Sequence, residues 1–202
     1  MRGASQLSEH EHAAYHEAAH AVVSLLLRVP FRHISVMASE ESRGRMVQGP
    51  ILEIREERDN PSTRTRLWLE RRIMVQLAGP AASRLLGWDE VGESDWCEAR
   101  AMARRVCSTE AEALAFERWL YERALNMLRE PATWEAVRLV AEALPERGRL
   151  GARAVRRIAG QVLPLRRGAR ADRSRVEAVT SRSGQPLVAE RAGLPYVPVR
   201  ER

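Results

Sequence analysis

The first part of the chain has the apolar spacing of an amphipathic helix. Its apolar positions fall on one helical face, namely Tyr15, Ala18, Ala19, Val22, Val23 and Leu26. Ser8 followed by Glu11 forms a capping-box pattern, which marks a helix start. Pro30 disfavours the helical conformation in the residue before it and so ends the pattern. The sequence therefore predicts a helix over 9–28.

The next segment changes from helical spacing to alternation. Ile34, Val36 and Ala38 alternate with other side chains, and the polar stretch ESRG separates them from Met46 and Val47. Alternating apolar positions on either side of a polar turn are typical of a hairpin. We therefore predict a short β-hairpin or small sheet directly after the first helix.

Helical patterns return after residue 60 and continue to about residue 160. Asn60-Pro61-Ser62 is a helix-start pattern in which Pro61 suits the first helical position. Gly79-Pro80 is expected to kink or break this helix. A further helix is predicted to begin at Ser94-Asp95, and later ones to cover about 111–129, 132–144 and 152–160. The expected fold class is mainly α, with one small sheet.

Beyond Val162 the apolar periodicity disappears, which predicts a folded domain over 1–165 and a flexible tail over 166–202. The chain has a net charge of +6, and all 33 of its basic residues are arginine. Nine of these arginines and four acidic residues lie in the tail. Nucleic-acid binding through this tail is the weakest of the functions that we consider, because Tyr196 is its only aromatic residue and acidic residues dilute its charge.

The remaining composition favours a cytoplasmic protein. Two cysteines, Cys97 and Cys107, do not make a disulfide framework, and both are expected to be small core residues. The N-terminal residues lack the apolar core of a signal peptide. The apolar stretch over 21–27 is much shorter than the roughly 20 residues that span a membrane.

The predicted first helix carries the motif His16-Glu17-Ala18-Ala19-His20, which has the form HExxH. Two histidines four residues apart lie on one helical face and can bind one zinc ion. Glu17 is expected to act as the general base on a water molecule bound to that ion. His10 and His12 are expected to face solvent. His12 and His20 lie too far apart along the helix to share one ion, at about 1.5 Å per residue.

A zinc site needs at least one more protein ligand. Spacing alone leaves seven candidates open, which are Asp89, Glu90, Glu93, Asp95, Cys97, Glu98 and Cys107. Asp95 also has an alternative structural role, because Asp95 followed by Glu98 matches a capping box.

Several segments in order resemble the peptidase domain of FtsH-type ATP-dependent zinc metalloproteases. These are AYHEAAHAVVSLLL with VPFRHISVM, then LAGPAASRLLG, then GESDWCEARAMARRV, and finally ERALNMLREPATWEAVRLVAEAL, which together cover about residues 10–160. The resemblance implies a zincin-like helical domain and a zinc-dependent metalloendopeptidase. It also implies that Asp95 is the third zinc ligand beside His16 and His20, with Glu17 as the catalytic residue.

The sequence departs from that family in three places. Ala19 replaces the usual glycine of HEAGH, and Pro80 and Ser83 replace an arginine and a glutamate of the AGRAAE segment. No GxxxxGK[ST] phosphate-binding motif occurs. The resemblance therefore implies hydrolysis of peptides or unfolded proteins, with a homo-oligomer and a separate ATPase as implied partners. An extended substrate is expected to pair with the strand around 34–37. The alternative is a catalytically silent FtsH-like binding or regulatory module that acts with a partner.

Overall fold

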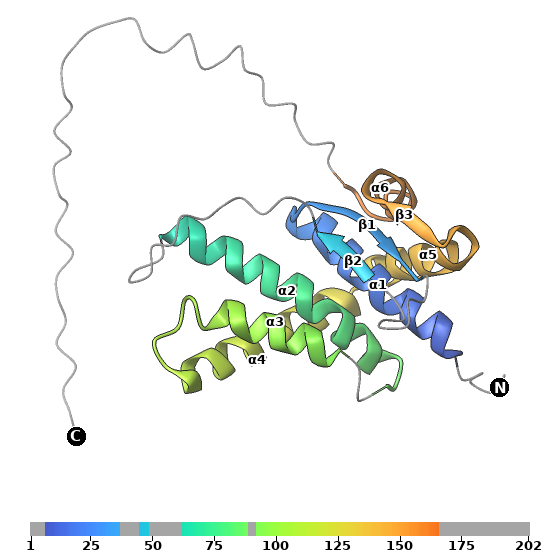
Figure 1. Ribbon diagram of the computed structural model, residues 1–202. Coiled ribbons are helices and arrows are strands. Elements are labelled where there is room, and N and C mark those ends of the chain that lie inside the picture. The colour runs from blue at the N-terminus through green and yellow to red at the C-terminus, as the bar shows by residue number, and fades with distance from the viewer. Residues whose placement is uncertain (1–6, 37–44, 49–61, 89–91, 166–202) are drawn as a thin grey trace, which may run out of the picture. The chain divides into compact units, whose positions relative to one another are not determined.

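The computed structural model describes residues 7–36, 45–48, 62–88 and 92–165 (Figure 1). These residues form a mainly helical domain with one small antiparallel sheet, which confirms the predicted fold class. The predicted tail over 166–202 lies outside the described residues. No helix among the described residues is both long and apolar enough to cross a membrane.

Helix α1 (Glu9–Leu27) begins as the sequence predicts. The Ser8 hydroxyl accepts a hydrogen bond from the Glu11 backbone N–H, and the Glu11 carboxylate accepts one from the Ser8 N–H at 2.8 Å. The helix ends at Arg28, whose backbone is left-handed with φ 58°. Every residue from Glu17 to Leu25 is buried, because α1 packs against α2 on one side and α5 on another.

The sheet has three strands, β1 (Phe31–Ser35), β2 (Arg45–Gln48) and β3 (Arg149–Gly151), in the order β2-β1-β3. The β1–β2 hairpin confirms the prediction, whereas β3 was not predicted. His33 pairs with Val47 on one side and with Gly151 on the other. Because β1 is the central strand, its backbone has no free edge over residues 33–35. The prediction that a substrate strand adds to this strand is therefore wrong there, and Met37 lies outside the described residues.

Helix α2 (Thr63–Leu85) differs from the prediction at its start and in its middle. Ser62 is the N-cap and accepts a hydrogen bond from the Thr65 N–H, so Pro61 precedes the helix instead of opening it. The helix also continues through Pro80 without a break. A proline inside a helix costs about 3 kcal/mol. Burial offsets this cost, because α2 packs against α1, α3 and α4 along its buried second half.

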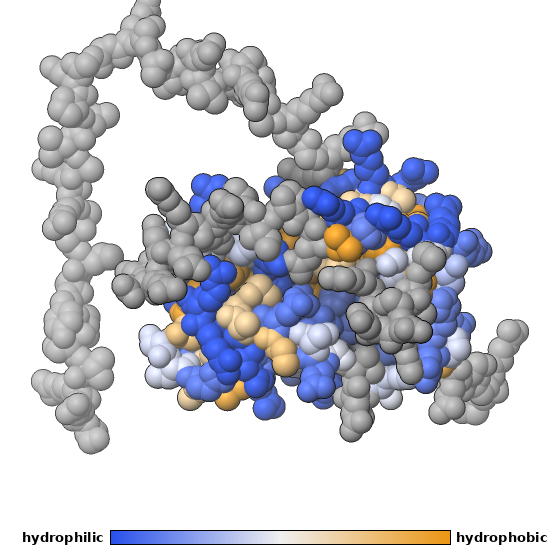
Figure 2. Space-filling view, in the orientation of Figure 1, coloured by the Kyte–Doolittle hydropathy of each residue, from blue (hydrophilic) through white to orange (hydrophobic). Residues whose placement is uncertain are grey.

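Four further helices complete the domain, α3 (Glu93–Ala103), α4 (Glu110–Arg129), α5 (Pro131–Arg147) and α6 (Ala152–Ala159). Their bounds match the predicted patterns to within a few residues. Helices α3 and α4 cover one side of α2, whereas α5 and α6 pack near α1 and the sheet (Figure 1). Figure 2 shows a mostly hydrophilic face with small apolar areas. Helices α1 and α2 thus form the centre of the core.

The two cysteines do not both lie in this core. Cys97 is exposed on α3 and Cys107 is half-buried after it. The prediction of two core cysteines is wrong, since the buried face of α3 carries Asp95, Ala99 and Ala103 instead.

Candidate metal centre

Two helices bring His16, His20 and Asp95 together. The two histidines lie on consecutive turns of α1, and Asp95 lies in the first turn of α3. His16 Nε2 is 2.9 Å from Asp95 Oδ2 and 3.1 Å from His20 Nε2. His20 Nε2 is 3.4 Å from the same carboxylate oxygen. Among the described residues these three atoms form the group that could hold a metal ion, and it is called the metal-binding group below.

Helix α2 orients both imidazoles through their Nδ1 atoms, which point away from the metal-binding group. His20 Nδ1 donates a hydrogen bond to the Val75 carbonyl at 2.7 Å. His16 Nδ1 lies 3.2 Å from the Ser83 hydroxyl, which donates its own proton to the Gly79 carbonyl at 3.1 Å. A hydroxyl has one proton, so Ser83 accepts from His16 Nδ1–H. Both Nε2 atoms are then free to serve as ligands, and they face the space that they share with Asp95 Oδ2.

The carboxylate of Asp95 is oriented in the same manner. Gln76 Nε2 donates to Asp95 Oδ1 at 2.7 Å, so Oδ2 faces the two histidines. Each of the three side chains therefore has one polar atom bonded to α2 and another at the centre. Outer partners of this kind fix the orientation of ligands in metal sites.

The three central atoms are all hydrogen-bond acceptors when both histidines are neutral. Three acceptors at these distances repel one another unless a cation lies between them. Ligands at about 2.0–2.1 Å in a tetrahedral zinc site are about 3.3 Å apart, close to the distances found here. The residues therefore fit a zinc ion in both donor type and spacing.

In the metal-free protein a proton on His20 supplies positive charge between these acceptors. Burial disfavours the charged form of His20, but the Asp95 carboxylate outweighs it and raises the pKa of His20 to about 9. Burial lowers the pKa of His16, against the opposing effect of Asp95. Burial alone would raise the pKa of Asp95, yet the adjacent His20 and His16 hold it well below its usual range.

Asp95 is not a helix cap. Gly92 is the N-cap of α3, so Asp95 is the third residue of the helix, and the capping-box alternative with Glu98 is wrong. Gly92 has φ 95°, a left-handed conformation that favours glycine. A β-carbon on Gly92 would lie 2.7 Å from Pro80 Cγ and 3.0 Å from Asp95 Oδ2. The start of α3 thus packs directly on α2 and the metal-binding group.

Gly79 allows α2 to approach the histidines. A β-carbon at Gly79 would lie 2.4 Å from Nε2 of both His16 and His20. Real β-carbons essentially never come within 3.0 Å of a heavy atom of this kind of neighbour. Any residue larger than glycine at position 79 would therefore displace the imidazoles. Only the close approach of two helices explains this glycine, and the sequence offered no signal for it beyond Gly79 itself.

Glu17 lies between the two histidines on α1 and is 5% exposed. Its Oε2 is buried and has no hydrogen-bond partner. Burial raises the pKa of Glu17 to about 7, against the lowering effect of His20. A buried carboxylate of this kind can accept a proton near neutral pH and release it again.

The other predicted ligand candidates do not join the group. Asp89 and Glu90 lie outside the described residues. The remaining alternatives are exposed or half-buried and lie outside the group, namely Glu93, Cys97, Glu98 and Cys107. The sequence interpretation missed the outer partners, which are Val75, Gln76, Gly79 and Ser83. The apolar neighbours of Gln76 in the sequence could have indicated this residue, because a polar side chain on a buried helical face needs a hydrogen-bond partner.

His10 is exposed as predicted, but the prediction for His12 is wrong. His12 is 4% exposed, and its ring stacks on Trp88 with centroids 4.1 Å apart and planes 12° apart. Burial lowers its pKa to about 4, so the ring is neutral at neutral pH. His12 is therefore part of the buried surroundings of the metal-binding group.

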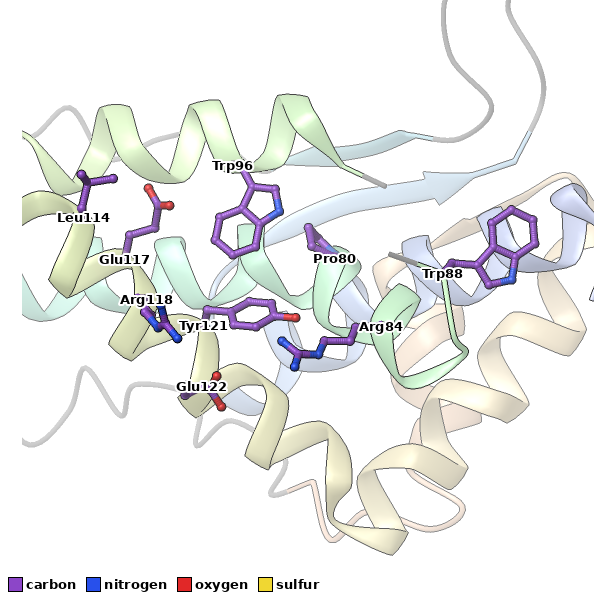
Figure 3. A pocket seen from close by; sticks show the side chains of 9 residues that line it. All are labelled: Pro80, Arg84, Trp88, Trp96, Leu114, Glu117, Arg118, Tyr121 and Glu122. Carbon is purple, nitrogen blue, oxygen red and sulfur yellow. The ribbon is translucent and has the colours of Figure 1, made fainter. Parts of the chain in front are cut away.

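A cavity of about 570 Å³ lies between α2, α3 and α4. Figure 3 shows its aromatic side chains Trp96 and Tyr121, with Pro80 and Trp88 on the side of α2. Trp96 directly follows Asp95, and Pro80 directly follows Gly79. The cavity is therefore built partly from the neighbours of residues at the metal-binding group.

Comparison with known proteins identifies no family. No protein-family model matches the chain, and no curated protein matches it significantly.

Proposed function

We propose that this protein is a zinc-dependent metallopeptidase of the FtsH type, in which His16, His20 and Asp95 bind the ion and Glu17 is the general base. The observation that carries the proposal is the convergence of His16 Nε2, His20 Nε2 and Asp95 Oδ2, while the other polar atom of each side chain bonds to α2. Among the described residues, the one positive charge beside these three acceptors is a proton on His20.

Zinc at this group would supply Lewis acidity and lower the pKa of a water molecule. Glu17 would accept the proton from the attacking water and deliver it to the leaving amine. Its burial favours this role, because burial raises the pKa of the carboxylate and so makes it a better proton acceptor. Ser83, Val75 and Gln76 would hold the ligands in place throughout.

The substrate that we propose is a peptide or an unfolded protein. The cavity beside Pro80 offers space for a substrate side chain, with Trp96 and Tyr121 as apolar contacts (Figure 3). A homo-oligomer, a separate ATPase that unfolds substrates and a cytoplasmic location remain parts of the proposal that rest on the sequence.

The buried Glu17 favours a peptidase over a silent binding module. A module that only retains the metal has no use for a carboxylate beside the ion. An unpaired buried polar atom costs about 1–3 kcal/mol, and Glu17 Oε2 is such an atom. A catalytic role explains why this cost is tolerated.

The test compares the wild type with Glu17→Gln and Asp95→Asn. Zinc content is measured by elemental analysis after dialysis, and hydrolysis with fluorescein-labelled casein and quenched peptides. We expect Glu17→Gln to keep zinc and lose hydrolysis, and Asp95→Asn to lose both. Unchanged hydrolysis in Glu17→Gln would refute the proposal. A wild type that binds zinc but cleaves nothing would favour the silent module.

A further inference from the structure

His12 has no role in the metal-binding group, yet it is buried one helical turn before His16. Its Nε2 has no hydrogen-bond partner. The His12 and His16 ring centroids are 6.5 Å apart, compared with 4.8 Å for His16 and His20. His12 thus lies next to the group without belonging to it.

Among the described residues, two buried side-chain polar atoms have no partner, and both lie beside the same ligand. These atoms are Glu17 Oε2 and His12 Nε2. Glu17 directly follows His16, and His12 precedes it by one turn. Buried polar atoms are nearly always paired in native proteins, so an unpaired one needs a partner such as a water, an ion or a substrate group. Both unpaired atoms thus belong to residues that adjoin the same proposed ligand, His16.

The ring of His12 is held in position by Trp88. Trp88 follows the left-handed turn at Gly87, whose φ is 80°, and its N–H donates to the Ser83 carbonyl at 3.0 Å. The same Ser83 orients His16 through its hydroxyl. Trp88 also lines the cavity that the proposed function assigns to a substrate side chain (Figure 3). His12 is therefore held in a fixed position one helical turn from His16, against a residue that lines this cavity.

From this geometry we infer that His12 is a further catalytic residue, whose Nε2–H donates a hydrogen bond to the carbonyl oxygen of the bound peptide. The inference rests on the proposed peptidase function. A peptide carbonyl is the natural partner because negative charge develops on its oxygen during hydrolysis, and a fixed neutral donor stabilises that charge without reorganisation. Glu17 and His12 then act on the same substrate from the two sides of His16.

The test is His12→Phe, because phenylalanine keeps an aromatic ring against Trp88 and removes only the ring nitrogens. We expect zinc content and the thermal midpoint to stay at wild-type values. The value of kcat on a quenched peptide should fall about 100-fold, with little change in KM, because a donor to the developing charge acts mainly in the transition state. His12→Gln restores an N–H donor and should recover about tenfold of this loss.

Binding measurements separate this inference from the proposed function. A phosphinic peptide carries the tetrahedral oxygens of the hydrolytic transition state, whereas acetohydroxamate binds only the metal. We expect His12→Phe to weaken the phosphinic peptide about 100-fold and to leave acetohydroxamate unchanged. A matched control is Trp119→Phe, an exposed aromatic change on α4 that should alter neither.

Three results would overturn the inference. Wild-type kcat and wild-type phosphinic-peptide affinity in His12→Phe would show that the nitrogen contacts no substrate, while the peptidase proposal would stand. Loss of zinc in this variant would assign His12 a structural or ligand role instead. Failure of the wild type both to cleave peptides and to bind the phosphinic peptide would refute the proposed function, and the inference with it.

Discussion

Gly79 lies so close to His20 that a β-carbon on the glycine would be 2.4 Å from the histidine Nε2. This contact joins α2 to the α1 helix at the metal-binding group. It also explains why α2 carries a glycine in a buried stretch, where glycine otherwise weakens a helix.

Replacement of this glycine should abolish the site. In Gly79→Ala the new methyl group must push both imidazoles away from their shared point. We expect loss of stoichiometric zinc binding and a decrease of about 1–3 kcal/mol in the free energy of unfolding of the metal-free protein. Zinc titration and urea unfolding measure the two effects. Gly151→Ala is the matched control, because its β-carbon would come no closer than 3.8 Å to the Arg32 carbonyl. Normal zinc binding in Gly79→Ala would contradict this account.

Ser83 should tune zinc affinity without being a ligand. The Ser83→Ala variant removes the acceptor of His16 Nδ1–H. Loss of such an outer partner typically weakens metal binding about 10–100-fold, and we expect a decrease in that range by competition with a chromophoric chelator. Ser24→Ala changes another fully buried serine, on the far part of α1, and should leave zinc affinity unchanged. Equal affinities in the two variants would refute the orienting role.

Zinc and a proton should compete for the metal-binding group. The metal-free protein carries a proton at His20, whose pKa is raised to about 9, and zinc binding requires the neutral ring. Below this pKa each bound ion must therefore displace one proton. The apparent Kd should fall about tenfold per pH unit from neutral pH up to about 9, and then level off.

Calorimetric titration in buffers of different ionisation enthalpy measures the released protons directly. We expect about one proton per zinc ion at neutral pH. An affinity that does not change with pH over this range would show that His20 is already neutral in the metal-free protein.

The contact between α3 and α4 offers a comparison of two similar ion pairs. Arg100 makes two hydrogen bonds to Glu117, which is 3% exposed, and Arg104 makes two to the exposed Glu110. Glu117→Gln should lower the free energy of unfolding by about 1–3 kcal/mol, because hydrogen bonds between charged groups are lost at a buried position. Glu110→Gln should cause no measurable change, since solvent screens an exposed pair. Urea unfolding at equal pH measures both, and equal effects would contradict the role of burial.

The sequence by itself determined the helices and the core of the site. Apolar spacing and the Ser8–Glu11 capping box fixed α1, and spacing four residues apart placed His16 and His20 on one face. These are local properties, in which the periodicity of a single helix decides the outcome. Spacing left seven candidates for the third ligand, and only the family resemblance singled out Asp95.

Only the tertiary structure decided what lies between the helices. It buried His12 against Trp88, exposed Cys97, kept α2 continuous through Pro80 and placed β1 in the centre of the sheet. It also brought Gly79 and Ser83 against the histidines of α1. Each of these depends on how residues far apart in the chain pack against one another, and periodicity along one helix contains no information about its neighbour. The HExxH motif thus predicted two ligands and a base, while the packing of α2 and α3 placed the third proposed ligand atom beside them, together with the partners that orient all three.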